Sequence, residues 1–302
     1  MGNTALRRRL PAFAAGLASL VMATGLAAIP AEAAPAPKVD YIAFGDSYTA
    51  GTGAGPFDFG YPCDQTPGGY VDVVGKTGRV NLVMNAACHG AVLSAANPFY
   101  DRSIPIPTVA EQIQNLPSGT LSGGTELVSI TAGANDLGFS YVLGQCAYYG
   151  SVACSNALAY VASPSKLAQL TAGLAATYNQ IQQAAPNATI AVMGYPLLFD
   201  PTSQYSPIPV ESQMLINQAT LLVNSTIAGA VSTANTVYST KAEYVGVTAS
   251  FAGHAVNSLE PWINLDPVNF TDPRNFHPNK EGHRAYASAL LEAVKPAQLV
   301  TR

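Results

Sequence analysis

The chain has 302 residues, with 14 Lys and Arg against 18 Asp and Glu, and charged residues make up only 11% of it. That is well below the usual quarter, so the surface is expected to be polar but mostly uncharged. An acidic balance without a basic patch argues against nucleic acid as a partner. The length suffices for one α/β domain with a sizeable core.

The first 33 residues have the three-part layout of a secretory signal peptide. Residues 7–9 are arginines, an apolar stretch rich in Ala and Gly spans about 13–29, and Ala31-Glu32-Ala33 offers the small residues that a signal peptidase reads. The small-residue composition and the cleavage site favour a signal over a membrane anchor. We expect a signal peptide over 1–33, a single domain over 34–302, and a secreted, extracellular protein. No later segment is expected to span a bilayer.

Residues predicted to form strands alternate with predicted helices. Short Val- and Ile-rich runs bounded by Gly or Asn are typical of buried parallel strands, and they occur at 41–44, 80–86, 126–131, 189–194 and 243–248. Amphipathic patterns predict helices over 165–184, about 211–231 and 279–294. This alternation predicts an α/β fold with a mainly parallel sheet covered on both faces.

Two irregular stretches, 51–69 and 97–107, are rich in Pro and aromatic residues. Beside the strand ends of an α/β sheet, such stretches either shape a substrate cleft or are plain surface loops.

The four cysteines, an even number in a chain predicted to be exported, indicate disulfides. Three pairings are formally possible, and local closure favours Cys63–Cys88 and Cys146–Cys154, each holding a loop beside a predicted strand. Neither the cysteines nor the histidines have the spacing of a metal site, so no metal is expected.

A serine follows the first predicted strand directly, in Gly45-Asp46-Ser47. The G-x-S-x-G elbow of α/β-hydrolases is absent. Gly45 permits a tight turn, and a helix that begins near Ser47 would direct backbone N–H groups towards its hydroxyl. Taken alone, this fragment favours Ser47 as a helix cap over Ser47 as a nucleophile.

Three further segments contain residues suited to catalysis. The second strand is followed by His89-Gly90, the third by Asn135-Asp136, and a histidine, His277, precedes the last helix. Each has a structural alternative. The alternative for Gly90 is a plain loop glycine, and the alternative for Asn135-Asp136 is a turn. The alternative for His277 is a residue that precedes a helix starting with proline.

In this order, the four segments resemble those of the GDSL/SGNH hydrolase superfamily, and in particular its secreted bacterial lipases, esterases and phospholipases. The resemblance implies a flavodoxin-like three-layer α/β/α sandwich with a mainly five-stranded parallel sheet. It implies Ser47 as nucleophile and His277 as general base. The oxyanion hole would consist of the N–H groups of Ser47 and Gly90 and the side-chain amide of Asn135. It also supports the two local disulfides, and it implies no cofactor.

One position departs from the family pattern. Most members have an aspartate three residues before the histidine, where this chain has Arg274. Some secreted bacterial members use a backbone carbonyl instead. We therefore predict a Ser47–His277 dyad, with the carbonyl of Asn275 or Arg274 bonded to the ring. Asp272 remains open as a third member.

The function predicted is a secreted serine hydrolase that cleaves carboxylic esters through an acyl-enzyme, with lipids, phospholipids or small esters as substrates. The loop aromatics would either receive the acyl chain or anchor the loops in the core. They are Phe57, Phe59, Tyr61, Phe99, Tyr100, Phe139 and Tyr141. A monomer with transient contact to a lipid surface is expected. The alternatives are a carbohydrate deacetylase and a non-catalytic exported binding domain.

Overall fold

The computed structural model describes residues 37–57, 62–104, 106–203, 205 and 208–299. The predicted signal peptide, residues 1–33, lies outside the described residues. The unit described below falls within Ala36–Arg302.

The five predicted strands form one sheet in which each hydrogen-bonded pair is parallel, so the predicted fold class is confirmed. The strand order is β2-β1-β3-β4-β5, the flavodoxin-like order. The strands are β1 (Val39–Gly45), β2 (Val80–Asn85), β3 (Leu127–Thr131), β4 (Thr189–Met193) and β5 (Ala242–Val245). The strand order reverses between β1 and β3. In folds of this order, ligands bind at this topological switch point.

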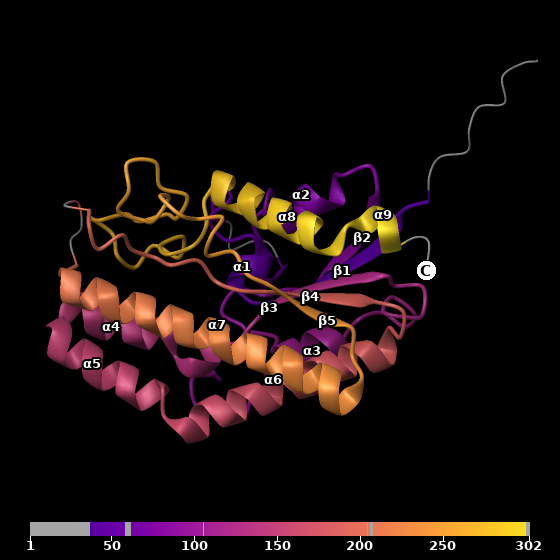
Figure 1. Cartoon of the computed structure of the whole chain (residues 1–302), viewed down its shortest axis with the longest axis horizontal. Helices are drawn as coiled ribbons and strands as arrows, with labels where there is room; N and C mark the ends of the chain where they lie inside the picture. Colours follow the sequence, from indigo (N-terminus) through magenta and orange to yellow (C-terminus); the bar gives the residue numbers. More distant parts are fainter. Residues whose placement is uncertain (1–36, 58–61, 105, 204, 206–207, 300–302) are drawn as a thin grey trace, which may run out of the picture. The chain divides into compact units, whose positions relative to one another are not determined.

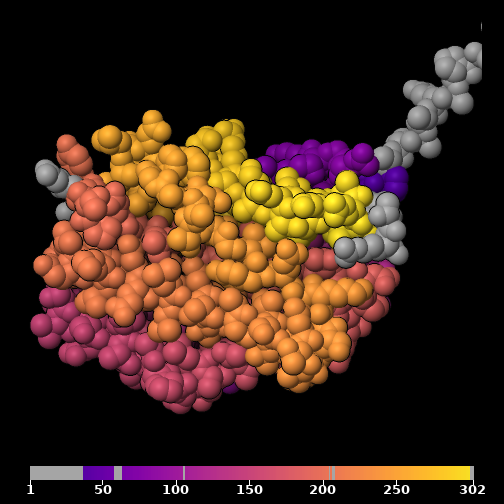
Figure 2. Space-filling model, viewed as in Figure 1, coloured from indigo at the N-terminus to yellow at the C-terminus, as the bar shows by residue number. Residues whose placement is uncertain are grey.

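Helices cover both faces of the sheet (Figure 1). One face carries α2 (Tyr70–Gly75), α8 (Lys280–Val294) and α9 (Pro296–Leu299); the other carries α3 (Val109–Gln114), α6 (Pro164–Ala184) and α7 (Val210–Tyr238). On the surface, the yellow residues of α8 lie beside the purple residues of α2, although the two helices are far apart in the sequence (Figure 2). The three-layer sandwich is therefore as predicted.

Helix α6 matches the predicted range to within one residue. It begins at Pro164, whose fixed φ suits the first turn, and its stripe of Leu170, Leu174, Tyr178 and Ile181 is buried. This buried stripe forms part of the hydrophobic core.

Helix α7 differs from the prediction in two ways. It continues to Tyr238 rather than about residue 231, because Ala234 is still buried, and it ends where Ser239 adopts a left-handed conformation. Contrary to expectation, α7 is long and apolar enough to cross a bilayer. Half of its apolar window is nevertheless buried inside the protein, against α6, α5 and β5, as in a core helix.

A pair of helices, α4 (Phe139–Tyr148) and α5 (Gly150–Val161), was not predicted. Neither helix has a side-chain N-cap bond or an acidic residue in its first turn, the features that mark a helix start in a sequence. The Cys146–Cys154 disulfide joins these two helices, which corrects the expectation that it holds a loop beside a strand. The Cys63–Cys88 disulfide joins the short turn at Pro62–Asp64 to the segment after β2.

Candidate active site

Ser47 is the first residue of α1 (Ser47–Ala50), a single turn that starts right after β1. The link requires glycine at position 45, because its φ is 128° and a Cβ there would collide with the carbonyl oxygen of Thr131 on β3. The Gln112 side chain bonds both the N–H and the carbonyl of Gly45, at 2.8 and 2.9 Å. The turn that presents Ser47 is therefore held from two sides.

Asp46 caps this turn from a buried position. Its Oδ1 accepts the N–H of Tyr48 at 3.0 Å, and its Oδ2 accepts the hydroxyl of Tyr195, which follows β4. Burial raises the pKa of this carboxyl from 3.8 to about 7, against the opposing effect of the two hydrogen bonds.

The hydroxyl of Ser47 lies 2.7 Å from Nε2 of His277, although the two residues are 230 positions apart. The other ring nitrogen, Nδ1, lies 2.9 Å from the carbonyl oxygen of Asn275. Because a carbonyl oxygen can only accept, Nδ1 carries the proton and Nε2 is left to accept the Ser47 hydroxyl.

The ring bonds Asn275 and not Asp272. Both carboxylate oxygens of Asp272 accept from the guanidinium of Arg274, at 2.9 and 2.6 Å, and these bonds lower the pKa of Asp272 to about 2. The backbone N–H of His277 donates to the Arg274 carbonyl at 3.1 Å. Of the options left open by the sequence, the structure places the Asn275 carbonyl at the imidazole.

The imidazole of His277 is held in its neutral form. Burial, with a smaller contribution from the His89 ring 5.5 Å away between centroids, lowers its pKa from 6.5 to about 3 against the opposing effect of the bond to Asn275. A neutral ring with a bare Nε2 is the form that can take a proton from a hydroxyl.

Of the three predicted oxyanion donors, two line the cavity beside the Ser47 hydroxyl, and Gly90 is not among the residues that line it. Ser47 and Asn135 line the same cavity, while Gly90 is exposed and follows His89, which also lines it. Among the described residues, neither the N–H of Ser47 nor that of Gly90 donates to a protein acceptor. The Asn135 amide donates one N–H to Ala91 at 2.9 Å and has a second one for a ligand.

Asn135 and Asp136 do more than form the turn that the sequence also allowed. They start a short 3-10 helix after β3, and Asp136 Oδ1 accepts the N–H of Leu93 at 3.0 Å. Together with the bond from Asn135 to Ala91, this holds the segment that carries Gly90, whose φ of 79° suits glycine.

A cavity of about 340 Å³ opens beside the Ser47 hydroxyl. Its walls come from α4, α7, the segment after β4 and the loop before His277. The apolar lining includes Phe139, Leu143, Ala147, Leu198, Val223 and Phe270.

The stretches 51–69 and 97–107 supply no lining residue in their described parts, contrary to the expectation that they shape the cleft. Of the seven aromatics predicted to receive an acyl chain, Phe139 lines the cavity. Phe59 and Tyr61 lie outside the described residues. The walls come instead from α4 and α7, because the disulfide-linked pair α4–α5 packs against α7.

The remaining histidines have protein partners. His89 Nδ1 and the Thr52 hydroxyl are hydrogen-bonded at 2.9 Å. His283 is fully buried, accepts the N–H of Tyr70 at Nδ1 and donates from Nε2 to the Thr52 carbonyl. His254 bonds the Glu260 carbonyl and stacks on Trp262. In the part of the chain that the structure describes, no cluster of His, Cys, Asp or Glu could hold a metal ion.

Sequence reasoning did not identify Tyr48 and Tyr195, which both line the cavity. Tyr195 had a usable signal, because it stands just beyond the carboxyl end of β4, the edge at which such sheets bind ligands. Tyr48 adjoins Ser47 but looks like any core aromatic in the sequence.

The chain is similar to known lipases in sequence and in fold. Residues 43–285 match the model of the GDSL-like lipase/acylhydrolase family. A lipase of Streptomyces rimosus is 29% identical over 294 residues, which cover 94% of this chain and 99% of that protein.

Two solved structures have a similar fold, and this chain covers almost the whole length of each. An extracellular lipase from Streptomyces rimosus has a TM-score of 0.70 and 27% identity, covering 85% of this chain and all of that one. Phospholipase A1 from Streptomyces albidoflavus has a TM-score of 0.69 and 26% identity, covering 84% and 99%. With the family match over most of its length, the chain belongs to the GDSL-like lipase/acylhydrolase family of carboxylic ester hydrolases.

Proposed function

We propose that the protein is a secreted lipase or esterase that forms an acyl-enzyme on Ser47, with His277 as general base. The observation that carries the proposal is the 2.7 Å hydrogen bond between Ser47 Oγ and His277 Nε2, in a ring whose other nitrogen is protonated. This pair has the relation of nucleophile and base that nucleophilic catalysis requires.

In the first half-reaction, His277 takes the hydroxyl proton as Ser47 Oγ attacks the ester carbonyl carbon. The N–H groups of Ser47 and Gly90 and the amide of Asn135 donate to the oxyanion that forms. Collapse of this intermediate breaks the bond to the leaving alcohol, which receives the proton from His277. Water then repeats the sequence on the acyl-enzyme and releases the acid. The Asn275 carbonyl keeps the ring in the required tautomer throughout.

The cavity favours an acyl group larger than acetyl. Its volume of about 340 Å³ is over twice that of an engineered apolar cavity of about 150 Å³ that accommodates benzene. An acetyl group would leave most of this apolar lining exposed to water. The cavity thus favours a lipase or esterase over a carbohydrate deacetylase, and the named relatives are a lipase and a phospholipase A1.

The chemistry and the substrate class are tested by separate experiments. A fluorophosphonate probe should label the wild-type protein and fail to label Ser47→Ala, whereas a binding-only protein would not be labelled at all. A panel of p-nitrophenyl esters from acetate to palmitate, with long-chain phospholipids beside it, then defines the acyl group. Activity on acetate alone would refute the lipolytic proposal.

Secretion is proposed from the layout of residues 1–33 and the extracellular relative. N-terminal sequencing of the protein recovered from culture medium tests it. A mature chain that begins just after Ala33 or Ala34 is expected, and retention of the full-length chain in the cell would contradict it.

A further inference from the structure

The residue after Ser47 contacts the loop that carries the base. The hydroxyl of Tyr48 donates a hydrogen bond of 2.7 Å to the backbone carbonyl of Phe276. Phe276 stands between Asn275, whose carbonyl bonds the imidazole, and His277 itself. The same single-turn helix, α1, therefore presents Ser47 and contacts the segment that orients the ring facing it.

That segment has an unusual backbone. Phe276 has a φ of 62°, in the left-handed region that non-glycine residues seldom adopt. The reversal at this residue lets a carbonyl two positions upstream face the ring of His277. Without contacts that favour it, a phenylalanine would leave this conformation, so the surroundings must hold it.

Hydrogen bonds from several residues hold the reversal, among them the bond of the His277 N–H to the Arg274 carbonyl and that of the Asp266 N–H to the Asn275 side chain. The Asn264 carbonyl accepts the N–H of Phe276, and the Asn264 N–H donates to the His277 carbonyl, both at 2.8 Å. Tyr48 supplies the bond to the carbonyl of Phe276. The peptide between Phe276 and His277 is thus set by a donor from outside the loop, whereas the Asn264 bonds come from the neighbouring strand-like segment.

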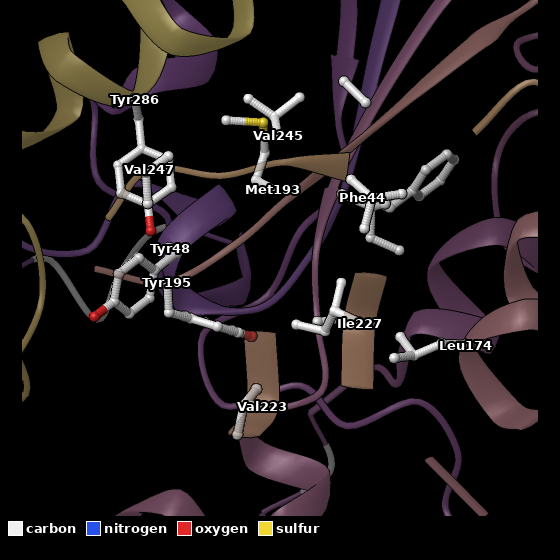
Figure 3. Close-up of a cluster of buried hydrophobic side chains, with 14 of the residues drawn as sticks. Phe44, Tyr48, Leu174, Met193, Tyr195, Val223, Ile227, Val245, Val247 and Tyr286 are labelled. Atoms are coloured by element: carbon white, nitrogen blue, oxygen red, sulfur yellow. The ribbon is translucent and has the colours of Figure 1, made fainter. Parts of the chain in front are cut away.

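The hydroxyl is delivered by a ring with little freedom to move. Tyr48 is 8% exposed, and its ring centroid lies 5.1 Å from that of Tyr195, 5.8 Å from Tyr286 and 5.3 Å from His277. Figure 3 shows the three tyrosines gathered at one end of the core. Asp46 also fixes the backbone N–H of Tyr48 at 3.0 Å.

We infer that Tyr48 is a positioning residue for the base: its hydroxyl holds the left-handed Phe276 so that the Asn275 carbonyl stays aligned with Nδ1 of His277. This role rests on the proposed function, because it concerns the base of that dyad. It replaces part of what a carboxylate partner does elsewhere, since a loop carbonyl can orient a ring only if the loop itself is held.

The test compares Tyr48→Phe with Tyr286→Phe in the full chain. Both variants remove one buried tyrosine hydroxyl that donates to a backbone carbonyl, Phe276 in one case and Gly194 in the other, and both keep the aromatic ring. Tyr48→Phe should lower kcat about tenfold with little change in KM, the loss expected from one misplaced hydrogen bond. Tyr286→Phe should lower thermal stability comparably and leave kcat close to that of the wild type.

A second measurement does not depend on turnover. The Nδ1 proton of His277, held on the Asn275 carbonyl, should give a low-field NMR signal in the wild type and in Tyr286→Phe. In Tyr48→Phe the signal should move upfield or broaden, because the acceptor is no longer fixed.

The inference is overturned if kcat falls no further in Tyr48→Phe than in Tyr286→Phe, if only KM changes, or if the NMR signal is unaffected. A wild-type protein that hydrolyses no ester, but whose Nδ1 signal responds to Tyr48→Phe alone, would refute the proposed function and support the positioning role.

Discussion

The imidazole of His277 donates its Nδ1 proton to the carbonyl oxygen of Asn275, two residues upstream in the same loop, at 2.9 Å. A neutral carbonyl fixes the tautomer of the ring, but it stabilises an imidazolium less than a carboxylate does. The candidate carboxylate, Asp272, forms an ion pair with Arg274 instead.

We therefore predict that Asp272→Asn retains most of the activity. Its kcat should fall at most about fivefold, because an exposed ion pair is worth about 0–1 kcal/mol. Under the same assay, His277→Ala should lose several orders of magnitude. Steady-state kinetics on p-nitrophenyl butyrate measures both, and equal losses in the two variants would make Asp272 a true third member.

Asn135→Ala should lower kcat by about 10²–10³ if the amide donates to the oxyanion. Asn135→Asp, which keeps the shape but replaces the donor with a negative charge, should lose at least as much. Thermal unfolding of both variants controls for the lost bond to Ala91. A rate equal to that of the wild type in a folded Asn135→Ala variant would remove this residue from the site.

The pH profile should reflect a base that is hard to protonate. Burial lowers the pKa of His277 to about 3. The kcat/KM on a neutral ester should therefore persist well below pH 6.5 and decline only as the pH approaches 3. The profile of Asp46→Asn serves as control, since the Asp46 carboxyl titrates at about 7. A wild-type acid limb centred near 6.5, unchanged in that variant, would contradict the prediction.

Asp46 should make the protein less stable as the pH rises. Its pKa is raised from 3.8 to about 7 on folding, so between these values the folded state binds more protons than the unfolded state. The stability from this group is present below about pH 4 and is lost as the pH rises through 7.

Asp46→Asn keeps a capping side chain and removes this titration. Relative to the wild type, the variant should gain up to about 4 kcal/mol in free energy of unfolding between pH 4 and 8, measured in urea. Asp272→Asn is the control: its carboxyl has a pKa lowered to about 2, so its difference from the wild type should stay nearly constant over this range. A constant difference for Asp46→Asn as well would refute the prediction.

Leu143 on α4 lines the cavity, so Leu143→Trp should shorten the preferred acyl chain. Each methylene excluded from the cavity loses about 0.8 kcal/mol, or about fourfold in kcat/KM. Val152→Trp on α5 introduces the same side chain at a position that is 75% exposed, and it should leave the preference unchanged. The ratio of kcat/KM for p-nitrophenyl palmitate and butyrate distinguishes them, and an unchanged ratio in Leu143→Trp would place the acyl chain elsewhere.

The fold could be predicted because its signals are local. Val- and Ile-rich runs marked the five strands, and the order of four short segments placed Ser47, Gly90, Asn135 and His277 just after strands or just before the last helix. Helices α4 and α5 were missed, since both begin without the side-chain cap or acidic first turn that would mark a helix start in the sequence.

The partners of these residues depend on backbone conformation and on contacts across the chain. The sequence by itself determined the strands, the disulfide pairs favoured by closure and the residues of the candidate site. Only the tertiary structure decided that Asn275 rather than Asp272 faces the imidazole, that α4 and α7 wall the cavity, and that Tyr48 reaches Phe276. The physical reason is that a left-handed residue in one loop and a hydroxyl 228 positions away leave no periodic signal, because they meet only once the sheet has formed.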